Sequence, residues 1–367
     1  MLRRRALALR NRLLSSARLR SFSNRFWPAR LVARSQAREL FDVIAGFTYS
    51  QVLFACVRLG VFDRLSNATA TVEQLAHDSE LTPAAWRDLL RAADSLHLVE
   101  CIADDEYTLG RLGVVMAADR SLQAMVLHHD NLYRDLVDPV ALLRGDLPGS
   151  ELGSYWPYAT KDTVSDEAAA RYSALMAASQ PMVAEQVLGA FSFAHYKTLL
   201  DVGGGSGAFV RAVAKKATHL DVQVFDLPPV AKLASESLES AGLAERSTVH
   251  GGDFRADALP AGADLISLIR IAHDHDDDTV LILLKKIREA LAPGGTLLIA
   301  EPMAGTAYAR RMGDAYFRFY LMAMGTGRPR TFEELSILLQ SSGFGSIEKH
   351  PTAIPMLAQV VSAKCNA

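Results

Sequence analysis

The sequence predicts an α/β protein in which an α-helical, winged-helix unit precedes a mostly parallel β-sheet. Helical patterns dominate the first half of the chain, and a hairpin pattern near residue 104 follows two short helical patterns. After residue 196, apolar strand-like runs alternate with helical stretches. Such alternation is typical of βαβ units in a parallel sheet, and the length of 367 residues fits more than one domain.

Four segments are expected along the chain. Residues 1–36 form a basic N-terminal segment, 37–118 a winged-helix dimerisation domain, 119–195 a helical connector and 196–367 the sheet domain. The composition, 50% hydrophobic and 22% charged, is that of an ordinary globular protein. The three cysteines lie far apart and predict no disulfide framework, so a reducing, cytoplasmic compartment is expected.

The N-terminal segment is strongly basic. Residues 1–38 contain eleven arginines and neither lysine nor acid, although the whole chain has a net charge of −2. A solvated tail, an amphipathic helix, a transit peptide and a segment that docks on an anionic membrane all fit this pattern. The helix would place four apolar side chains on one face: Leu2, Ala6, Leu9 and Leu13. In the docked alternative, Phe22, Phe26 and Trp27 would add interfacial burial.

Residues 41–62 are apolar but include Asp42, Gln51 and Arg58, so we expect a buried helix there and no membrane span. Two short helices meet at Leu81-Thr82-Pro83, and a hairpin follows with Asp104-Asp105 at its tip. A DNA-binding winged helix carries an excess of basic side chains on its second helix. Residues 82–97 offer three basic and two acidic side chains, which favours dimerisation over nucleic-acid binding.

A glycine loop follows the first predicted strand of the sheet domain. In "LLDVGGGSGAF", Gly203, Gly205 and Gly207 permit a tight turn and close approach of the backbone to a ligand. The helix that begins near Ala208 would present free N–H groups to that ligand. The loop alone is a weak signal, because it also fits a dinucleotide site of the G-x-G-x-x-A type.

Acidic residues after the next two strands strengthen this signal. Asp226 ends "VQVFD", where a carboxylate can accept hydrogen bonds from both ribose hydroxyls. Asp253 and Phe254, in "HGGDF", suit the amine and the ring face of adenine. With Asp201 in the strand before the glycine loop, three acids at successive strands favour an adenosine cofactor over independent loop carboxylates.

The stretch "RIAHDHDDDTV" raises a choice between a metal site and a general base. A metal site of the H-x-H-x-D type needs further ligands, and the sequence supplies only His350 after His275. The three aspartates after His275 precede a helical pattern, where they would cap N–H groups. We therefore expect no metal, and we expect His273, at a strand end, to serve as a general base.

These motifs, together with "APGGTLLIAE", occur in the order found in class I S-adenosylmethionine-dependent O-methyltransferases. The chain resembles the plant-type and acetylserotonin-type small-molecule branch over roughly residues 37–362. The resemblance implies a Rossmann-like methyltransferase sheet, a winged-helix dimerisation domain, a homodimer and S-adenosylmethionine as cofactor. The carotenoid-tailoring members of the branch have a similar basic N-terminal segment, which disfavours the transit peptide.

The resemblance also implies roles for individual residues. The Gly203–Gly207 loop would hold the methionine part of the cofactor, and Asp226 the ribose. The adenine would lie at Gly252, Asp253 and Phe254, and Arg270 would contact the cofactor. His273 matches the catalytic base, and Glu301 a carboxylate that orients it. Two positions depart from the family: Pro329 replaces an acid, and His275 replaces tryptophan.

The residues after Glu301 are rich in aromatic side chains and methionine, which fits either a buried helix or an apolar pocket for the methyl acceptor. "ELFDVIAGFTYSQVLFACVRLGVF" and "GDAYFRFYLMAMGTGRPRT" resemble the bacterial carotenoid-tailoring branch, which methylates a tertiary hydroxyl of acyclic carotenoids. That branch often has tyrosine at position 273 beside a histidine at 275, so His275 stays a candidate base. A methyltransferase of small phenols or polyketides, and a winged-helix regulator without catalysis, remain alternatives.

Overall fold

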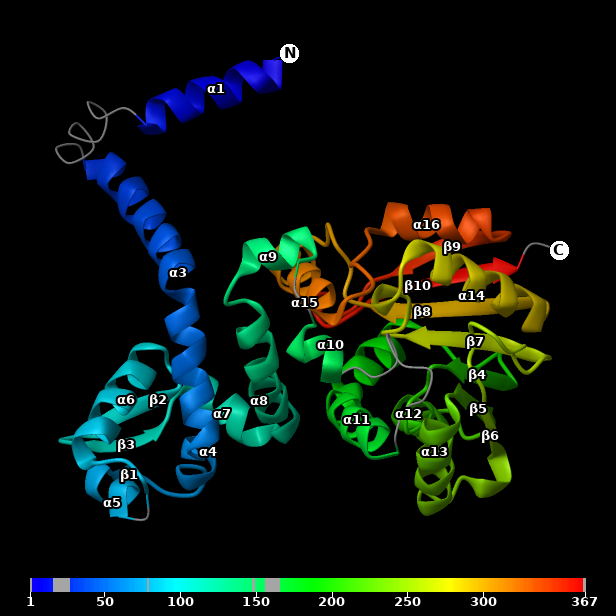
Figure 1. The fold of residues 1–367 in the computed structure, drawn as a ribbon, viewed down its shortest axis with the longest axis horizontal. Helices are drawn as coiled ribbons and strands as arrows, with labels where there is room; N and C mark the ends of the chain where they lie inside the picture. Colours follow the sequence, from blue (N-terminus) through cyan, green and yellow to red (C-terminus); the bar gives the residue numbers. More distant parts are fainter. Residues whose placement is uncertain (1, 16–26, 78, 147–148, 156–165, 366–367) are drawn as a thin grey trace. The chain divides into compact units, whose positions relative to one another are not determined.

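The first 119 residues form helices around a small antiparallel sheet (Figure 1). The computed structural model describes residues 2–15, 27–77, 79–146, 149–155 and 166–365, and its two compact units are Met1–Asp119 and Arg120–Ala367. The sheet has the order β1-β3-β2. Its strands are β1 (Ala70–Thr71), β2 (Val99–Ala103) and β3 (Glu106–Leu109). The helices are α1 (Leu2–Ser15), α3 (Trp27–Arg58), α4 (Val61–Arg64), α5 (Val72–His77), α6 (Pro83–Ser95) and α7 (Arg111–Ala118).

Helix α6 and the hairpin confirm the predicted winged-helix unit. The Thr82 hydroxyl caps α6 by accepting from the Ala85 N–H (3.3 Å), and a proline occupies the first turn. Arg87 donates from Nε to Asp105 at the hairpin tip (2.8 Å). This ion pair joins α6 to the turn between β2 and β3, so one of the few basic side chains of α6 is used within the unit.

Helix α3 corrects one expectation. Residues 41–62 were expected to be buried, but the first half of that stretch is exposed because the small core of this unit reaches only the C-terminal end of α3, at Cys56 and Val57. Five large apolar side chains are 60–73% exposed: Leu40, Phe41, Val43, Ile44 and Phe47. By length and composition alone, Arg30–Arg58 would also suffice to cross a membrane. This part of α3 therefore presents an exposed apolar face.

The second unit contains a seven-stranded sheet with the order β6-β5-β4-β7-β8-β10-β9 (Figure 1). Strands β4 to β8 pair in parallel, whereas β10 pairs antiparallel with both β8 and β9. The strands are β4 (Thr198–Val202), β5 (Asp221–Asp226), β6 (Ser247–Gly251), β7 (Ala263–Ile269), β8 (Leu291–Glu301), β9 (Phe344–His350) and β10 (Gln359–Cys365). The predicted parallel α/β sheet is confirmed, with an antiparallel strand inserted at one edge.

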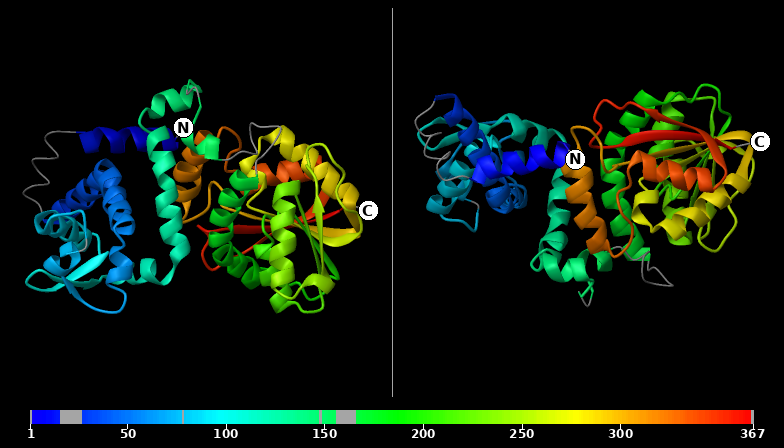
Figure 2. Two further views of the ribbon diagram at one scale, coloured as in Figure 1. Left: turned by 60° about the horizontal axis from the view of Figure 1, so that its bottom comes forward. Right: turned by 90° about the horizontal axis from the view of Figure 1, so that it is seen from above.

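Helices cover both faces of this sheet (Figure 2). Successive strand residues point to opposite faces, so Leu199 packs with one layer and Leu200 with the other. One layer consists of α11 (Asp166–Ala190), α12 (Ala208–Lys216) and α13 (Pro228–Ser240), and the other of α14 (Asp277–Ala290) and α16 (Phe332–Ser341). Burial on both faces explains why the strands read as nearly continuous apolar runs.

A helical group from two distant parts of the chain completes the second unit. Helices α8 (Arg120–Asp135), α9 (Pro139–Arg144) and α10 (Glu151–Tyr155) pack against η3, a π-helix (Arg311–Tyr316), and α15 (Phe317–Met324). The Asp135 carboxylate accepts from the N–H groups of Glu151 and Leu152 (2.8 and 2.9 Å), which fixes α10 to the end of α8. The predicted helical connector is thus packed on the segment that follows Glu301.

Candidate active site

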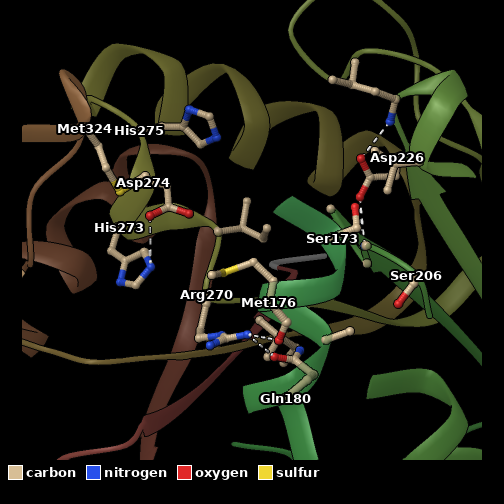
Figure 3. Close-up of a pocket in the computed structure, with 18 of the residues that line it drawn as sticks. Ser173, Met176, Gln180, Ser206, Asp226, Arg270, His273, Asp274, His275 and Met324 are labelled. Carbon is tan, nitrogen blue, oxygen red and sulfur yellow. Dashed lines mark hydrogen bonds and ion pairs between the residues drawn. The ribbon is translucent and has the colours of Figure 1, made fainter. Parts of the chain in front are cut away.

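An open cavity with about 1360 Å³ of empty space lies at the carboxyl ends of the parallel strands (Figure 3). Ligands of open α/β sheets bind at this edge. Every predicted cofactor-binding residue except Gly207, and both candidate base histidines, line the cavity. Helix α11 contributes Ser173, Met176 and Gln180, and the apolar part is formed by Met125, Phe317, Leu321 and Met324.

The glycine loop has the backbone that the sequence predicts. Gly203, Gly205 and Gly207 have φ angles of +72°, +58° and +74°, which side chains rarely allow. A Cβ at Gly203 would lie 2.5 Å from Cδ1 of Ile271. Gly207 is the N-cap of α12, whose first N–H groups open beside the loop. The loop therefore forms a cradle whose backbone favours glycine at these positions.

Asp226 is held by the backbone alone. Its Oδ2 accepts from the Gly205 N–H and its Oδ1 from the Leu227 N–H, both at 2.8 Å (Figure 3). Burial raises the pKa of Asp226 to about 6, although both hydrogen bonds oppose that shift. Each oxygen keeps acceptor capacity for a ligand. A carboxylate fixed in this way suits the two adjacent hydroxyls of a ribose.

Gly252 to Phe254 form the next part of the wall. The Gly252 N–H donates to the Asp226 carbonyl (2.9 Å), and a Cβ there would lie 2.8 Å from Cζ of Phe225. Asp253 forms an ion pair with Arg255 (2.8 Å). Burial raises the pKa of Asp253, but the hydrogen bonds and charge of Arg255 outweigh it, so the pKa is lowered. This position thus offers a carboxylate and an aromatic ring beside a glycine.

Arg270 follows β7 with φ +59°, an uncommon left-handed backbone for a side chain of this size. Its guanidinium donates to the Ser179 hydroxyl (2.8 Å), the Met176 carbonyl (3.0 Å) and Oε1 of Gln180 (2.6 Å). Figure 3 shows the contacts with Met176 and Gln180 of α11 at the cavity wall. Arg270 therefore ties α11 to the sheet edge, beside the space predicted for the cofactor.

His273 and Asp274 form a pair at the centre of the cavity. Nε2 of His273 lies 3.1 Å from Oδ1 of Asp274, whereas Nδ1 is buried and has no hydrogen-bond partner among the described residues. Burial lowers the pKa of His273, but the charge and hydrogen bond of Asp274, with the charge of Glu301, raise it above the ordinary value. The imidazole is therefore oriented through one nitrogen, while the other keeps its hydrogen-bonding capacity unused among the described residues.

Glu301 contacts His273 through the backbone. Its Oε2 accepts from the His273 N–H (2.9 Å), and its Oε1 has no hydrogen-bond partner among the described residues. Burial raises the pKa of this fully buried carboxyl. The carboxylate that contacts the imidazole itself is Asp274. The sequence does not indicate a catalytic role for Asp274, because this residue resembles the neighbouring acids that precede a helix.

His275 points away from His273 in Figure 3. Its ring packs edge-on against Phe254, with centroids 5.2 Å apart. Burial lowers the pKa of His275. The predicted helix cap beyond it is confirmed, because Asp276 accepts from the Thr279 N–H (2.8 Å) at the start of α14. The described part of the chain contains no group of three or more His, Cys, Asp or Glu side chains arranged to hold a metal.

Residues 326–330, the holding segment, secure the loop that carries both histidines. Four consecutive carbonyls of the loop, from Ala272 to His275, each accept a hydrogen bond from it. The donors are Arg330 Nη1, the Arg328 N–H, Thr326 Oγ1 and Arg330 Nη2, at 2.6, 2.9, 2.7 and 2.8 Å. The Arg330 side chain is fully buried. The stretch that makes these contacts is "GTGRPRT", in which Pro329 stands where the family has an acid.

The comparisons with known proteins agree with this geometry. Residues 133–345 match the family model of the O-methyltransferase domain, and residues 41–119 match that of the O-methyltransferase dimerisation domain. The second match supports a homodimer. The chain is 43% identical to a demethylspheroidene O-methyltransferase of Cereibacter sphaeroides, over 96% of this chain and 93% of the relative. A relative of the same name from Rhodobacter capsulatus is 40% identical over 96% of this chain and 88% of the relative.

A solved structure confirms the fold class. Human N-acetylserotonin methyltransferase in complex with SAM superposes with a TM-score of 0.74 at 25% identity, covering 90% of this chain and 98% of that chain. The glycine cradle and the backbone-held Asp226 fit such a cofactor, so S-adenosylmethionine is the methyl donor. From the two family models and the similarity to both relatives along nearly the whole sequence, we conclude that the chain belongs to the O-methyltransferase family.

Proposed function

We propose that the protein methylates the tertiary hydroxyl of an acyclic hydroxycarotenoid. The two relatives with at least 40% identity carry the name demethylspheroidene O-methyltransferase, which supports this class of methyl acceptor. The cavity supports it as well, because its wall opposite the glycine loop is mostly apolar and rich in methionine, which adapts to irregular shapes.

The proposed base is His273, and its free Nδ1 carries this proposal. The Asp274 carboxylate accepts from Nε2–H, which leaves the lone pair on Nδ1 to take the proton of the hydroxyl. Asp274 then neutralises the resulting imidazolium. Glu301 and the holding segment fix the backbone of His273 while this happens. General bases of this kind contribute roughly 10²–10⁴-fold in rate.

The proposed cofactor contacts follow from the geometry of the cavity wall. S-adenosylmethionine supplies an activated methyl group, so the chain needs to align the reacting groups and remove a proton. The Asp226 carboxylate accepts hydrogen bonds from the ribose hydroxyls, and the loop from Gly203 to Gly207 approaches the methionine part of the cofactor. Asp253 and Phe254, with Gly252 between them and the ribose site, hold the adenine. Arg270 fixes α11 beside the cofactor and contacts it.

The experiment that tests the function is transfer of a labelled methyl group. Purified protein is incubated with labelled S-adenosylmethionine and detergent-solubilised hydroxycarotenoids, and in parallel with simple phenols. Label is expected in the carotenoid ether. Transfer to phenols without transfer to any hydroxycarotenoid would replace the proposal by the phenol alternative.

We further propose that the protein is cytoplasmic and binds the inner membrane surface peripherally through residues 1–36. On α1, Arg3, Arg5, Arg10 and Arg12 are exposed, and so is Leu9. Anionic lipid attracts arginine by roughly 1 kcal/mol per residue near the surface. The other apolar side chains invoked for this segment, namely Leu2, Leu13, Phe22, Phe26 and Trp27, lie outside the described side chains. A long carotenoid resides in the bilayer, so docking there would bring the enzyme to it.

A further inference from the structure

Two histidine–tyrosine pairs join α8 to the segment after Glu301. Nε2 of His129 lies 2.6 Å from the Tyr316 hydroxyl, and Nε2 of the adjacent His128 lies 2.9 Å from the Tyr320 hydroxyl. Both tyrosines line the cavity. They are polar groups in the part of the cavity that is otherwise lined by Met125, Met176, Phe317, Leu321 and Met324.

Tyr316 and His273 both lie beside the ring of Phe317. The ring centroid of Tyr316 lies 5.0 Å from that of Phe317, and Phe317 lies 5.8 Å from His273. Tyr316 also ends the π-helix η3, and such helices occur frequently at functional sites. On α8, Met125 stands one turn before His129 and lines the cavity, so this face of α8 belongs to the same wall.

The protonation states leave Tyr316 able to bind a ligand. Burial lowers the pKa of His129 and raises the pKa of Tyr316, so at neutral pH the pair consists of an imidazole and a phenol. A phenol has one donor and two acceptor sites, and the contact with His129 uses one of them. When Nε2 of His129 carries the imidazole proton, it donates to the Tyr316 oxygen and leaves the phenol proton for a ligand.

We propose that Tyr316, held by His129, donates a hydrogen bond to the hydroxyl oxygen of the methyl acceptor. This rests on the proposed function. As the oxygen–methyl bond forms, the carbon–sulfur bond breaks with its electron pair left on sulfur, and the hydroxyl proton passes to Nδ1 of His273. The oxygen attacks with one lone pair, and its second lone pair accepts from Tyr316, so the fixed donor holds the attacking lone pair in line with the methyl carbon. Tyr316 also distinguishes an alcohol from a hydrocarbon of the same shape.

The test compares an acyclic carotenoid that has a tertiary hydroxyl with the same carotenoid lacking it. The wild-type protein is expected to bind the hydroxylated form about tenfold more tightly in detergent micelles. Tyr316→Phe should abolish most of this preference and, through misalignment of the attacking oxygen, lower kcat about 10- to 100-fold, with unchanged affinity for S-adenosylhomocysteine. His129→Gln keeps an N–H donor and should retain activity, whereas His129→Leu should behave like Tyr316→Phe.

Tyr196→Phe is the matched control, since it removes a hydroxyl that bonds Thr296 (3.1 Å) at a position remote from the cavity residues. It should change neither the preference nor kcat. A Tyr316→Phe protein with the wild-type preference and kcat would overturn the proposal, as would a loss confined to Tyr320→Phe. A wild-type protein that binds both carotenoids equally would also overturn it. Failure of the proposed function is seen separately, as absence of methyl transfer to any hydroxycarotenoid by the wild-type protein.

Discussion

Nε2 of His273 and Oδ1 of Asp274 lie 3.1 Å apart, although the two residues are neighbours in the chain. The short 3₁₀ turn Ala272–Asp274 makes this contact possible, since it brings adjacent side chains into the same buried space. The pair leaves Nδ1 of His273 as the buried nitrogen without a hydrogen-bond partner among the described residues.

Replacement of each histidine separates the two candidate bases. His273→Ala is expected to lower kcat by roughly 10²–10⁴-fold, while affinity for S-adenosylhomocysteine stays nearly unchanged because the imidazole acts on the methyl acceptor. His275→Ala is expected to have a smaller effect, since its ring packs on Phe254. Turnover is measured at saturating cofactor, and affinity by calorimetry. A larger loss in the His275 variant would identify that residue as the base.

The pH profile reports the Asp274 contact. His273 acts as a base when neutral, and its pKa is raised, so kcat should fall as the pH drops through a value above the ordinary histidine pKa of about 6.5. Asp274→Asn removes the charge that raises the pKa of His273, so this limb should move to lower pH. A limb at the same pH in both proteins would show that Asp274 does not govern the base.

Cofactor affinity should depend on the charge of Asp226. Because burial raises the pKa of this carboxyl to about 6, S-adenosylhomocysteine should bind more weakly as the pH falls below that value. Asp226→Asn should bind weakly at every pH, and Asp226→Ala more weakly still. Calorimetry across this pH range measures both, and NAD serves as the control ligand. Tight binding of NAD would contradict the assigned cofactor site.

The Arg330 side chain should contribute strongly to stability. Its replacement by methionine removes donors to two loop carbonyls and to Asp277, at a cost of about 1–3 kcal/mol for each buried carbonyl left unpaired. Arg134→Ala is the matched control, because its ion pair with Asp130 is exposed and is worth less than about 1 kcal/mol. Denaturant unfolding measures both. Equal stability losses would contradict a special role for the buried guanidinium.

Residues 1–36 should be needed for membrane attachment and dispensable for catalysis. The truncated protein is expected to methylate detergent-solubilised acceptor at the wild-type rate but to lose flotation with anionic liposomes. Flotation of the full-length protein should weaken at high salt, since ionic strength screens the arginines. Neutral liposomes are the control. If the full-length protein does not float with anionic liposomes at low salt, the proposed membrane-binding role of residues 1–36 is contradicted.

The sequence predicts the parts of the fold that depend on local constraints. The positive φ angles of Gly203, Gly205 and Gly207 strongly favour glycine, and the strand pattern predicts a sheet buried on both faces. It does not reveal which atom a buried carboxylate reaches, so Glu301 was expected at the imidazole and contacts the backbone of His273. The exposure of Phe41 and Phe47 was also hidden, because an apolar helix face does not disclose what covers it.

Contacts between distant segments were the least visible. His128 and His129 lie almost two hundred residues before their tyrosine partners, and no local pattern links them. Asp274 was hidden for the opposite reason. It stands among five other titratable residues, His273, His275 and Asp276 to Asp278, and the run of acids suggests a helix start. Only the turn at residues 272–274 separates its role from theirs.

The holding segment couples the shape of the cavity wall to the position of the proposed base, and this coupling constrains how the enzyme can evolve. The same stretch of chain, from η3 through α15 to Arg330, forms one wall of the cavity and then fastens four carbonyls beside the base. A mutation that reshapes the wall by displacing this stretch also displaces His273. Activity on a new methyl acceptor is therefore obtained most easily by exchanging side chains on an unchanged backbone. The alternative is to replace residues 302–331 as a whole by the corresponding segment of a relative. Grafts that end between Met324 and Arg330 should yield proteins that bind a new acceptor and turn it over poorly.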